Sequence, residues 1–439
     1  MHRDVNEEAF AATLDIASVN IYHDTQDKFS GARQSLIEDF VRSLKQDNFL
    51  VTETNAQSTD WTSSHQFPPF DGQLREDVYT HIANGANMVE YWHWASIPAN
   101  QETYWKGVLS HDFAPNRAYA EVSRTGYELQ SIGGTLASLK QHNQVAILWS
   151  RDSLNAIDVM PFAAGISQWA DGSAPWSKNE TVSANSDPLV NQIHNALYRL
   201  NTGVDFIFPD TKNWSQYKLL IVPSLYIADD ALLNRISAYV KNGGHVVMTF
   251  KSGFCNENSA VRWDLAPGPL RAAALFSYQE FSNLRRPLTL KGDPYRAGSG
   301  NEVGNWAEFL RPDHAITVAY YDDKFFARWP AITENHYGSG TLPYEGTYLS
   351  DALQLSVLRR ELGVAGLRDP AQSLASTLHT VQATDHLGKI VRFVFNYSGK
   401  LATFTYFAPS GKDLLTGKHI AKDQQVTIDP WDLIIVVQP

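Results

Sequence analysis

Two glutamates, Glu53 and Glu102, lie among residue types that suit carbohydrate chemistry. Glu53 closes the short apolar segment Asn48–Glu53, and Glu102 lies in the aromatic-rich stretch between Glu90 and Trp105. A carboxylate can act as a nucleophile or as a general acid–base, and it accepts hydrogen bonds from hydroxyl groups. Aromatic rings can stack on the faces of sugar rings. The pattern favours a site that binds a sugar and has a carboxylate available for catalysis.

Each glutamate also has a plainer interpretation. Glu53 could be an exposed strand-end residue that caps the next helix, and the aromatic residues around Glu102 could form a core patch. Three histidines, His65, His93 and His111, could lie near the same site, but a structural role suits each of them better.

The elements that must position Glu53 and Glu102 alternate between strand and helix over residues 1–140. Apolar runs predict strands, and apolar residues at helical spacing predict helices. The predicted strands are 14–22, 48–53 and 87–92, and the predicted helices are 31–46, 74–84 and 117–139. Strict alternation indicates a parallel sheet with helical crossovers. Three such units form only the last part of an eight-fold barrel, in which the catalytic groups end the strands as Glu53 does.

Two further domains are expected downstream. Residues 141–369 read as a doubly wound α/β domain, with buried strands at 144–149, 218–222 and 245–250. From residue 370 to 439 the pattern changes to alternating apolar and polar residues between turns, which predicts a small all-β domain.

Composition excludes several classes of protein. The 439 residues carry a net charge of −11 without long runs of one sign, so a nucleic-acid partner is not expected. No segment is apolar enough for a membrane helix, and the first residues do not resemble a signal peptide, which makes the cytoplasm the expected location. The single cysteine, Cys255, excludes an internal disulfide. No cofactor and no metal are predicted.

Together these residues resemble the family 42 glycoside hydrolases, which are β-galactosidases. The family's nucleophile motif has a Trp eight positions after the Glu, as Glu53 and Trp61 do. The family's preceding strand ends in a sugar-lining Tyr, similar to Tyr22. The segment Ile82–Trp94 resembles the family's helix-Gly-Ala-strand-aromatic signature, and Glu102 matches the glutamate that follows it.

The resemblance covers essentially the whole chain. It implies the C-terminal portion of a (β/α)8 TIM barrel, then an amidotransferase-like (flavodoxin-like) trimerisation domain, then a C-terminal β domain. It also implies a homotrimer that hydrolyses terminal β-galactosyl residues, with Glu53 as nucleophile. Tyr22, Trp61, Glu102 and Trp105 would then bind the galactoside.

Three departures from the family's pattern change the expected activity. Trp105 stands where the family usually has His, and the cysteines of the family's zinc cluster are missing. The family's acid/base lies in an Asn-Glu pair far before Tyr22, whereas Asn6–Glu7 is too close and reads as the tail of a surface helix. The chain is therefore expected to lack the acid/base and to be nearly inactive on alkyl galactosides by itself.

Other functions stay open. A non-catalytic carbohydrate-binding or assembly module derived from such an enzyme is the main alternative. A working amidotransferase with Cys255 as nucleophile is disfavoured, because the Gly expected two positions after the nucleophile is missing.

Overall fold

The computed structural model describes residues 5–58, 66–164, 166 and 188–438. The described chain divides into two compact units. The first unit contains residues 7–142, 201–203 and 369–439, and the second contains mainly residues 143–200 and 204–368.

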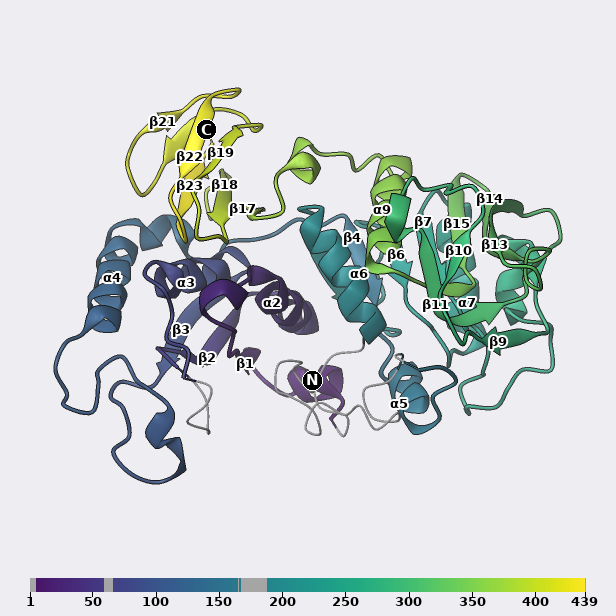
Figure 1. Ribbon diagram of the computed structural model, residues 1–439, viewed down its shortest axis with the longest axis horizontal. Coiled ribbons are helices and arrows are strands. Elements are labelled where there is room, and N and C mark those ends of the chain that lie inside the picture. Colours follow the sequence, from purple (N-terminus) through teal and green to yellow (C-terminus); the bar gives the residue numbers. More distant parts are fainter. Residues whose placement is uncertain (1–4, 59–65, 165, 167–187, 439) are drawn as a thin grey trace. The chain divides into compact units, whose positions relative to one another are not determined.

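The amino-terminal part of the first unit has a parallel sheet in the order β1-β2-β3, formed by Ser18–Asn20, Phe49–Asn55 and Ala86–Trp92. The short helix α1 (Glu7–Ala12) precedes this sheet. The connecting helices are α2 (Gly31–Lys45) and α3 (Gln73–Ala83), and α4 (Arg117–Leu136) follows β3. Figure 1 shows α2 and α3 together beside the strands. The predicted strand–helix alternation is confirmed in these elements.

Two sequence-based expectations at the start of this unit are wrong. The strand expected over residues 14–22 is only Ser18–Asn20, because the Leu14 carbonyl accepts a hydrogen bond from Lys45 Nζ at 2.6 Å instead of a strand neighbour. The pair Asn6–Glu7 lies at the start of a helix and not at its tail, since α1 begins at Glu7.

The carboxyl-terminal part of the first unit consists of two small antiparallel sheets. One has the order β17-β18-β23-β20-β21 and the other pairs β19 with β22. Their bounds are Leu378–Thr384 (β17), Ile390–Asn396 (β18), Ala402–Thr405 (β19), Gly411–Asp413 (β20), His419–Ile420 (β21), Gln425–Ile428 (β22) and Leu433–Val437 (β23). Val78 and Tyr79 of α3 pack in one hydrophobic core with Phe393 and Ile435 of these strands.

The second unit contains a mixed sheet. Five parallel strands have the order β5-β4-β6-β7-β15, which is the flavodoxin-like order 2-1-3-4-5. These strands are Val145–Leu148 (β4), Val204–Ile207 (β5), Leu219–Val222 (β6), His245–Thr249 (β7) and Gly340–Glu345 (β15). Its helices include α5 (Arg151–Val159), α6 (Pro188–Arg199), α7 (Asp230–Lys241), α8 (Arg271–Ala274) and α9 (Asp351–Val364).

The predicted doubly wound arrangement is found in only about half of this sheet. Beyond β15 the order continues through β14-β13-β10-β11-β16, all antiparallel, with β9 paired to β11. Antiparallel neighbours need only a tight turn, such as the one between β14 and β15, where Gly338 has φ +62°. The added strands are Phe281–Asn283 (β9), Leu288–Leu290 (β10), Glu302–Glu308 (β11), Ile316–Asp322 (β13), Pro330–Tyr337 (β14) and Thr347–Leu349 (β16).

Candidate active site

A local irregularity in β2 decides the direction of the Glu53 side chain. Val19 pairs with Val51 but the next residue, Asn20, pairs with Glu53, so β2 has one extra residue, Thr52, at this point. Successive side chains alternate between the two faces of a strand, and an inserted residue changes that alternation. Thr52 and Glu53 are both half-buried, whereas Val51 is fully buried. The irregularity therefore keeps Glu53 on the partly open side of the sheet.

Tyr22 holds the Glu53 carboxylate. Its hydroxyl donates a hydrogen bond to Glu53 Oε2 at 2.5 Å, and the backbone N–H of Ile21 donates to the Glu53 carbonyl at 2.8 Å. Burial raises the pKa of Tyr22 well above its usual value, and the hydrogen bond to Glu53 and the charge of Glu102 raise it further. Tyr22 is thus a neutral hydrogen-bond donor that fixes one oxygen of Glu53.

Glu102 and Trp105 join this pair from the segment after β3. Glu102, in the short 3₁₀ helix Gln101–Tyr104, accepts a hydrogen bond from Trp92 Nε1 at 3.2 Å. The Trp105 ring meets the Tyr22 ring edge to face, with centroids 5.2 Å apart. Tyr22 therefore contacts both Glu53 and Trp105, and Glu102 is held by Trp92 at the end of the neighbouring strand.

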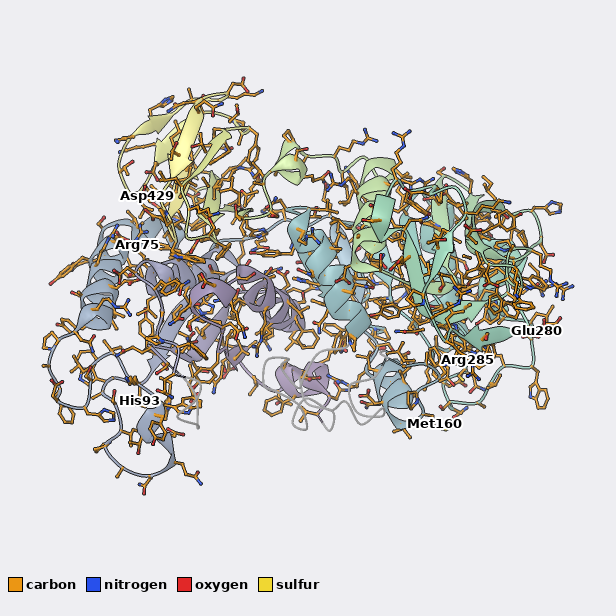
Figure 2. All side chains as sticks on the ribbon, in the orientation of Figure 1. Arg75, His93, Met160, Glu280, Arg285 and Asp429 are labelled. Carbon is orange, nitrogen blue, oxygen red and sulfur yellow. The ribbon has the colours of Figure 1, made fainter. Side chains whose placement is uncertain are left out.

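The structure brings together four of the five predicted site residues: Tyr22, Glu53, Glu102 and Trp105. The fifth, Trp61, lies outside the described residues, as does His65. His93 follows β3, and burial lowers the pKa of its ring although Glu102 acts in the opposite direction; Figure 2 labels its position. His111 is exposed, and its Nε2 lies 3.1 Å from the Ile97 carbonyl.

The plainer interpretation of Glu53 as a cap of the next helix does not fit the structure, and that of the aromatic residues around Glu102 as a core patch fits only in part. The helix after Glu53, α3, begins after Gly72 with no side-chain cap. Trp94 and Tyr104 near Glu102 are 62% and 46% exposed, whereas Tyr91 packs against a hydrophobic core, so only part of this aromatic stretch forms a core patch.

Sequence reasoning missed a buried polar network behind β2. It consists of His23, Glu38, Asp77 and His81, with Gln34 and Thr54 at its edges. A signal was present: Gln34, Glu38 and Arg42 recur at four-residue spacing on α2, and Asp77 and His81 do so on α3. Such spacing is usually found on a solvated helix face, and only the tertiary structure shows that this face is buried.

Cys255 is not an activated nucleophile, because burial outweighs the hydrogen bond from Tyr226 and the charges of Lys251 and Arg262 that favour its thiolate. It is buried beside Tyr226, and burial raises the pKa of its thiol. The residues with positive φ between β7 and Cys255 are Lys251, at +60°, and Gly253, at +71°, and Cys255 itself does not have a positive φ. Among the described residues, no group of three or more His, Cys, Asp or Glu side chains could hold a metal ion. No helix in the described part of the chain is both long and apolar enough to cross a bilayer.

Three family models match this chain in order. The model described as "Beta-galactosidase" matches residues 1–132, the "Beta-galactosidase trimerisation domain" matches 143–368, and the "Beta-galactosidase C-terminal domain" matches 384–438.

Curated relatives and solved structures agree with these matches. β-Galactosidase BgaA of Clostridium cellulovorans is 26% identical over 91% of this chain, and β-galactosidase LacZ of Lactobacillus acidophilus is 25% identical over 98%. The chain spans only 56% and 61% of the lengths of these two relatives. The β-galactosidase structure from Bacillus circulans sp. alkalophilus superposes on the whole chain with a TM-score of 0.86 at 22% identity, and this chain covers 62% of it.

The match to the trimerisation domain alone covers more than half of the chain, and the other two models extend it on both sides. This chain therefore belongs to the β-galactosidase family of glycoside hydrolases, family 42.

Proposed function

We propose that this chain provides the nucleophile-bearing part of a retaining β-galactosidase, with Glu53 as the nucleophile. The observation that supports this most is the hydrogen bond from Tyr22 to Glu53, because it orients one oxygen of a half-buried carboxylate. Glu102 and Trp105 lie beside Tyr22, and we assign them to the hydroxyls and the ring face of the sugar. Trp61 is assigned to the same site from its sequence position alone.

The first chemical step needs only Glu53 from this chain. One oxygen of its carboxylate attacks the anomeric carbon, the bond from that carbon to the leaving oxygen breaks, and a glycosyl ester forms. A retaining enzyme also needs a second carboxyl group about 5 to 5.5 Å away, which protonates the leaving oxygen and later activates water. We assign no such group among the described residues. A leaving group that departs as a stable anion does not need this proton.

A trapping experiment tests the proposal. The probe is 2,4-dinitrophenyl 2-deoxy-2-fluoro-β-D-galactoside, whose leaving group departs as dinitrophenolate. We expect the intact mass of the chain to rise by one fluorogalactosyl unit and peptide mapping to place it on Glu53. The variant Glu53→Gln should not be labelled. Labelling of another residue, or no labelling of the wild-type chain, would refute Glu53 as the nucleophile.

The second candidate is a non-catalytic assembly module. The observation in its favour is that the longest family match is to a trimerisation domain. We propose a homotrimer in either case, with domain boundaries near residues 140 and 369. If galactose binds, as measured by calorimetry, while the fluorinated galactoside leaves no covalent label, the non-catalytic function is the correct one.

A further inference from the structure

The carboxylate of Asp77 contacts the two strand ends that carry Tyr22 and Glu53. His23 directly follows Tyr22, and its Nε2 lies 3.1 Å from Asp77 Oδ1. Thr54 directly follows Glu53, and its hydroxyl donates to Asp77 Oδ2 at 3.4 Å. One side chain on α3 thus holds the residue after Tyr22 and the residue after Glu53.

A second contact joins the same two strand ends without Asp77. The backbone N–H of His23 donates to Asn55 Oδ1 at 3.1 Å. Asn55 and Thr54 are both fully buried, so neither can exchange its protein partner for water at low cost. The strand ends therefore move together, and Asp77 is their common anchor on the helix.

Charge balance inside the network keeps Asp77 in place. His81 Nε2 lies 3.3 Å from Asp77 Oδ1, and His81 Nδ1 contacts Glu38 on α2. Both ring nitrogens of His81 face carboxyl groups, an arrangement that favours the protonated ring. Burial alone would raise the pKa of Asp77, but His23 and His81 outweigh it and hold this pKa well below its usual range. Asp77 is a fully buried carboxylate with fixed partners.

We propose that Asp77 is a positioning residue that sets the distance and angle between Tyr22 and Glu53. This inference rests on the proposed function for its catalytic consequence, but not for its structural one. Asp77 does not touch the site where a sugar would bind. It acts through His23 and Thr54, which directly follow Tyr22 and Glu53 in the sequence.

The first test reads the Tyr22 hydroxyl directly and needs no catalysis. The chain is labelled with ¹³C at the Cζ of tyrosine, and Tyr22→Phe identifies the Tyr22 resonance. In Asp77→Asn this resonance should move toward the position of an unbonded phenol. The matched control is Glu76→Gln, which makes the same change at the neighbouring, equally buried residue of α3, and it should leave the resonance in place.

The second test measures trapping by the fluorinated galactoside. Asp77→Asn should slow the maximal rate of labelling about 10-fold or more, because small displacements of reacting groups slow the reaction strongly. The probe concentration that gives half of the maximal rate should stay within about twofold of the wild-type value. Glu76→Gln should change neither quantity. If Asp77→Asn does not fold, Thr54→Val removes only the 3.4 Å contact and should show the same changes at smaller size.

Several results would overturn the inference. An unmoved Tyr22 resonance in Asp77→Asn, or an equal movement in Glu76→Gln, would reduce Asp77 to a general packing role. If the Tyr22 resonance moves in Asp77→Asn but the rate of trapping is unchanged, Asp77 positions Tyr22 without affecting catalysis. If the wild-type chain is not labelled at all, the proposed function fails, and the resonance alone then decides whether Asp77 positions Tyr22.

Discussion

Some buried charges in this protein are neutralised by neighbouring charges of opposite sign. His81 shows this most clearly, because its ring is fully buried between the carboxylates of Glu38 and Asp77. Burial disfavours the charged ring, but the two carboxylates outweigh burial and raise the pKa of His81 to about 10. Removing one partner of such a group is expected to cost far more than removing an exposed charge.

His81 should make stability depend on pH above neutrality. The pKa of the folded ring is above the unfolded value of about 6.5, so its contribution is complete below that pH and is lost as pH rises through 10. We expect the free energy of unfolding to fall by up to about 1.4 kcal/mol per pH unit across this window. Urea unfolding at pH 7, 8, 9 and 10 measures it.

A variant pair assigns this pH dependence to His81. His81→Gln should be less stable at pH 7 and should show a flatter dependence between pH 7 and 10. His386→Gln, in an exposed turn, should behave like the wild-type chain. A slope unchanged in His81→Gln would contradict the assignment.

At the scale of elements, Arg75 connects three parts of the first unit. It lies on α3, its Nε is 2.6 Å from Glu128 Oε2 on α4, and its Nη1 is 2.5 Å from Asp432 Oδ1 next to β23. Figure 2 labels Arg75 where α3 meets the carboxyl-terminal strands. Only 4% of its side chain is exposed. Glu121 and Glu128 of α4 both contact α3 at Arg75, Glu121 through the Arg75 backbone N–H and Glu128 through the Arg75 side chain.

Arg75→Met should destabilise the chain by about 2–3 kcal/mol. It leaves Asp432 without its counter-charge and Glu128 with only the exposed Arg124, and the partial exposure of Glu128 and Asp432, 21% and 33%, keeps the loss below that of a fully buried pair. Arg124→Met removes a 64% exposed partner of the same Glu128 and should cost at most about 0.5 kcal/mol. Chemical unfolding measures the free energy of unfolding of both variants. Equal losses of stability would show that the buried Arg75 contacts stabilise the chain no more than the exposed Arg124 contact.

For the whole molecule, the second unit corresponds to the trimerisation domain of the family. Its mixed sheet has its own hydrophobic core, which includes Val222 of β6, Ile236 of α7 and Met248 of β7. Because the second unit has its own core, we expect the proposed assembly through this unit not to depend on an occupied sugar site.

The full chain should therefore have a molar mass in solution of about three times its 49.1 kDa. Light scattering after size exclusion measures this mass at several concentrations. Glu53→Gln should give the same mass as the wild-type chain, because assembly is assigned to the second unit. A mass of one chain at all concentrations would contradict the homotrimer.

Much of the framework followed from local patterns. Apolar periodicity predicted α2, α3 and α4 and the strands that carry Glu53 and Trp92, because those patterns reflect burial on one face of each element. Residue type and position at a strand end pointed to Glu53 and Glu102, and the resemblance to family 42 added Tyr22, Trp61 and Trp105. The carboxyl ends of neighbouring parallel strands meet at one edge of a sheet, which is why residues at such ends can be expected to lie together.

The remaining features needed the tertiary structure. The extra residue in β2 that turns Glu53, and the antiparallel half of the second sheet, arise from pairing between strands that the sequence does not display. The contacts of Asp77 with His23 and Thr54 join residues that are 54 and 23 positions apart in the sequence. A charged residue on a helix looks the same in sequence whether it faces water or a buried partner, and only packing decides between these environments.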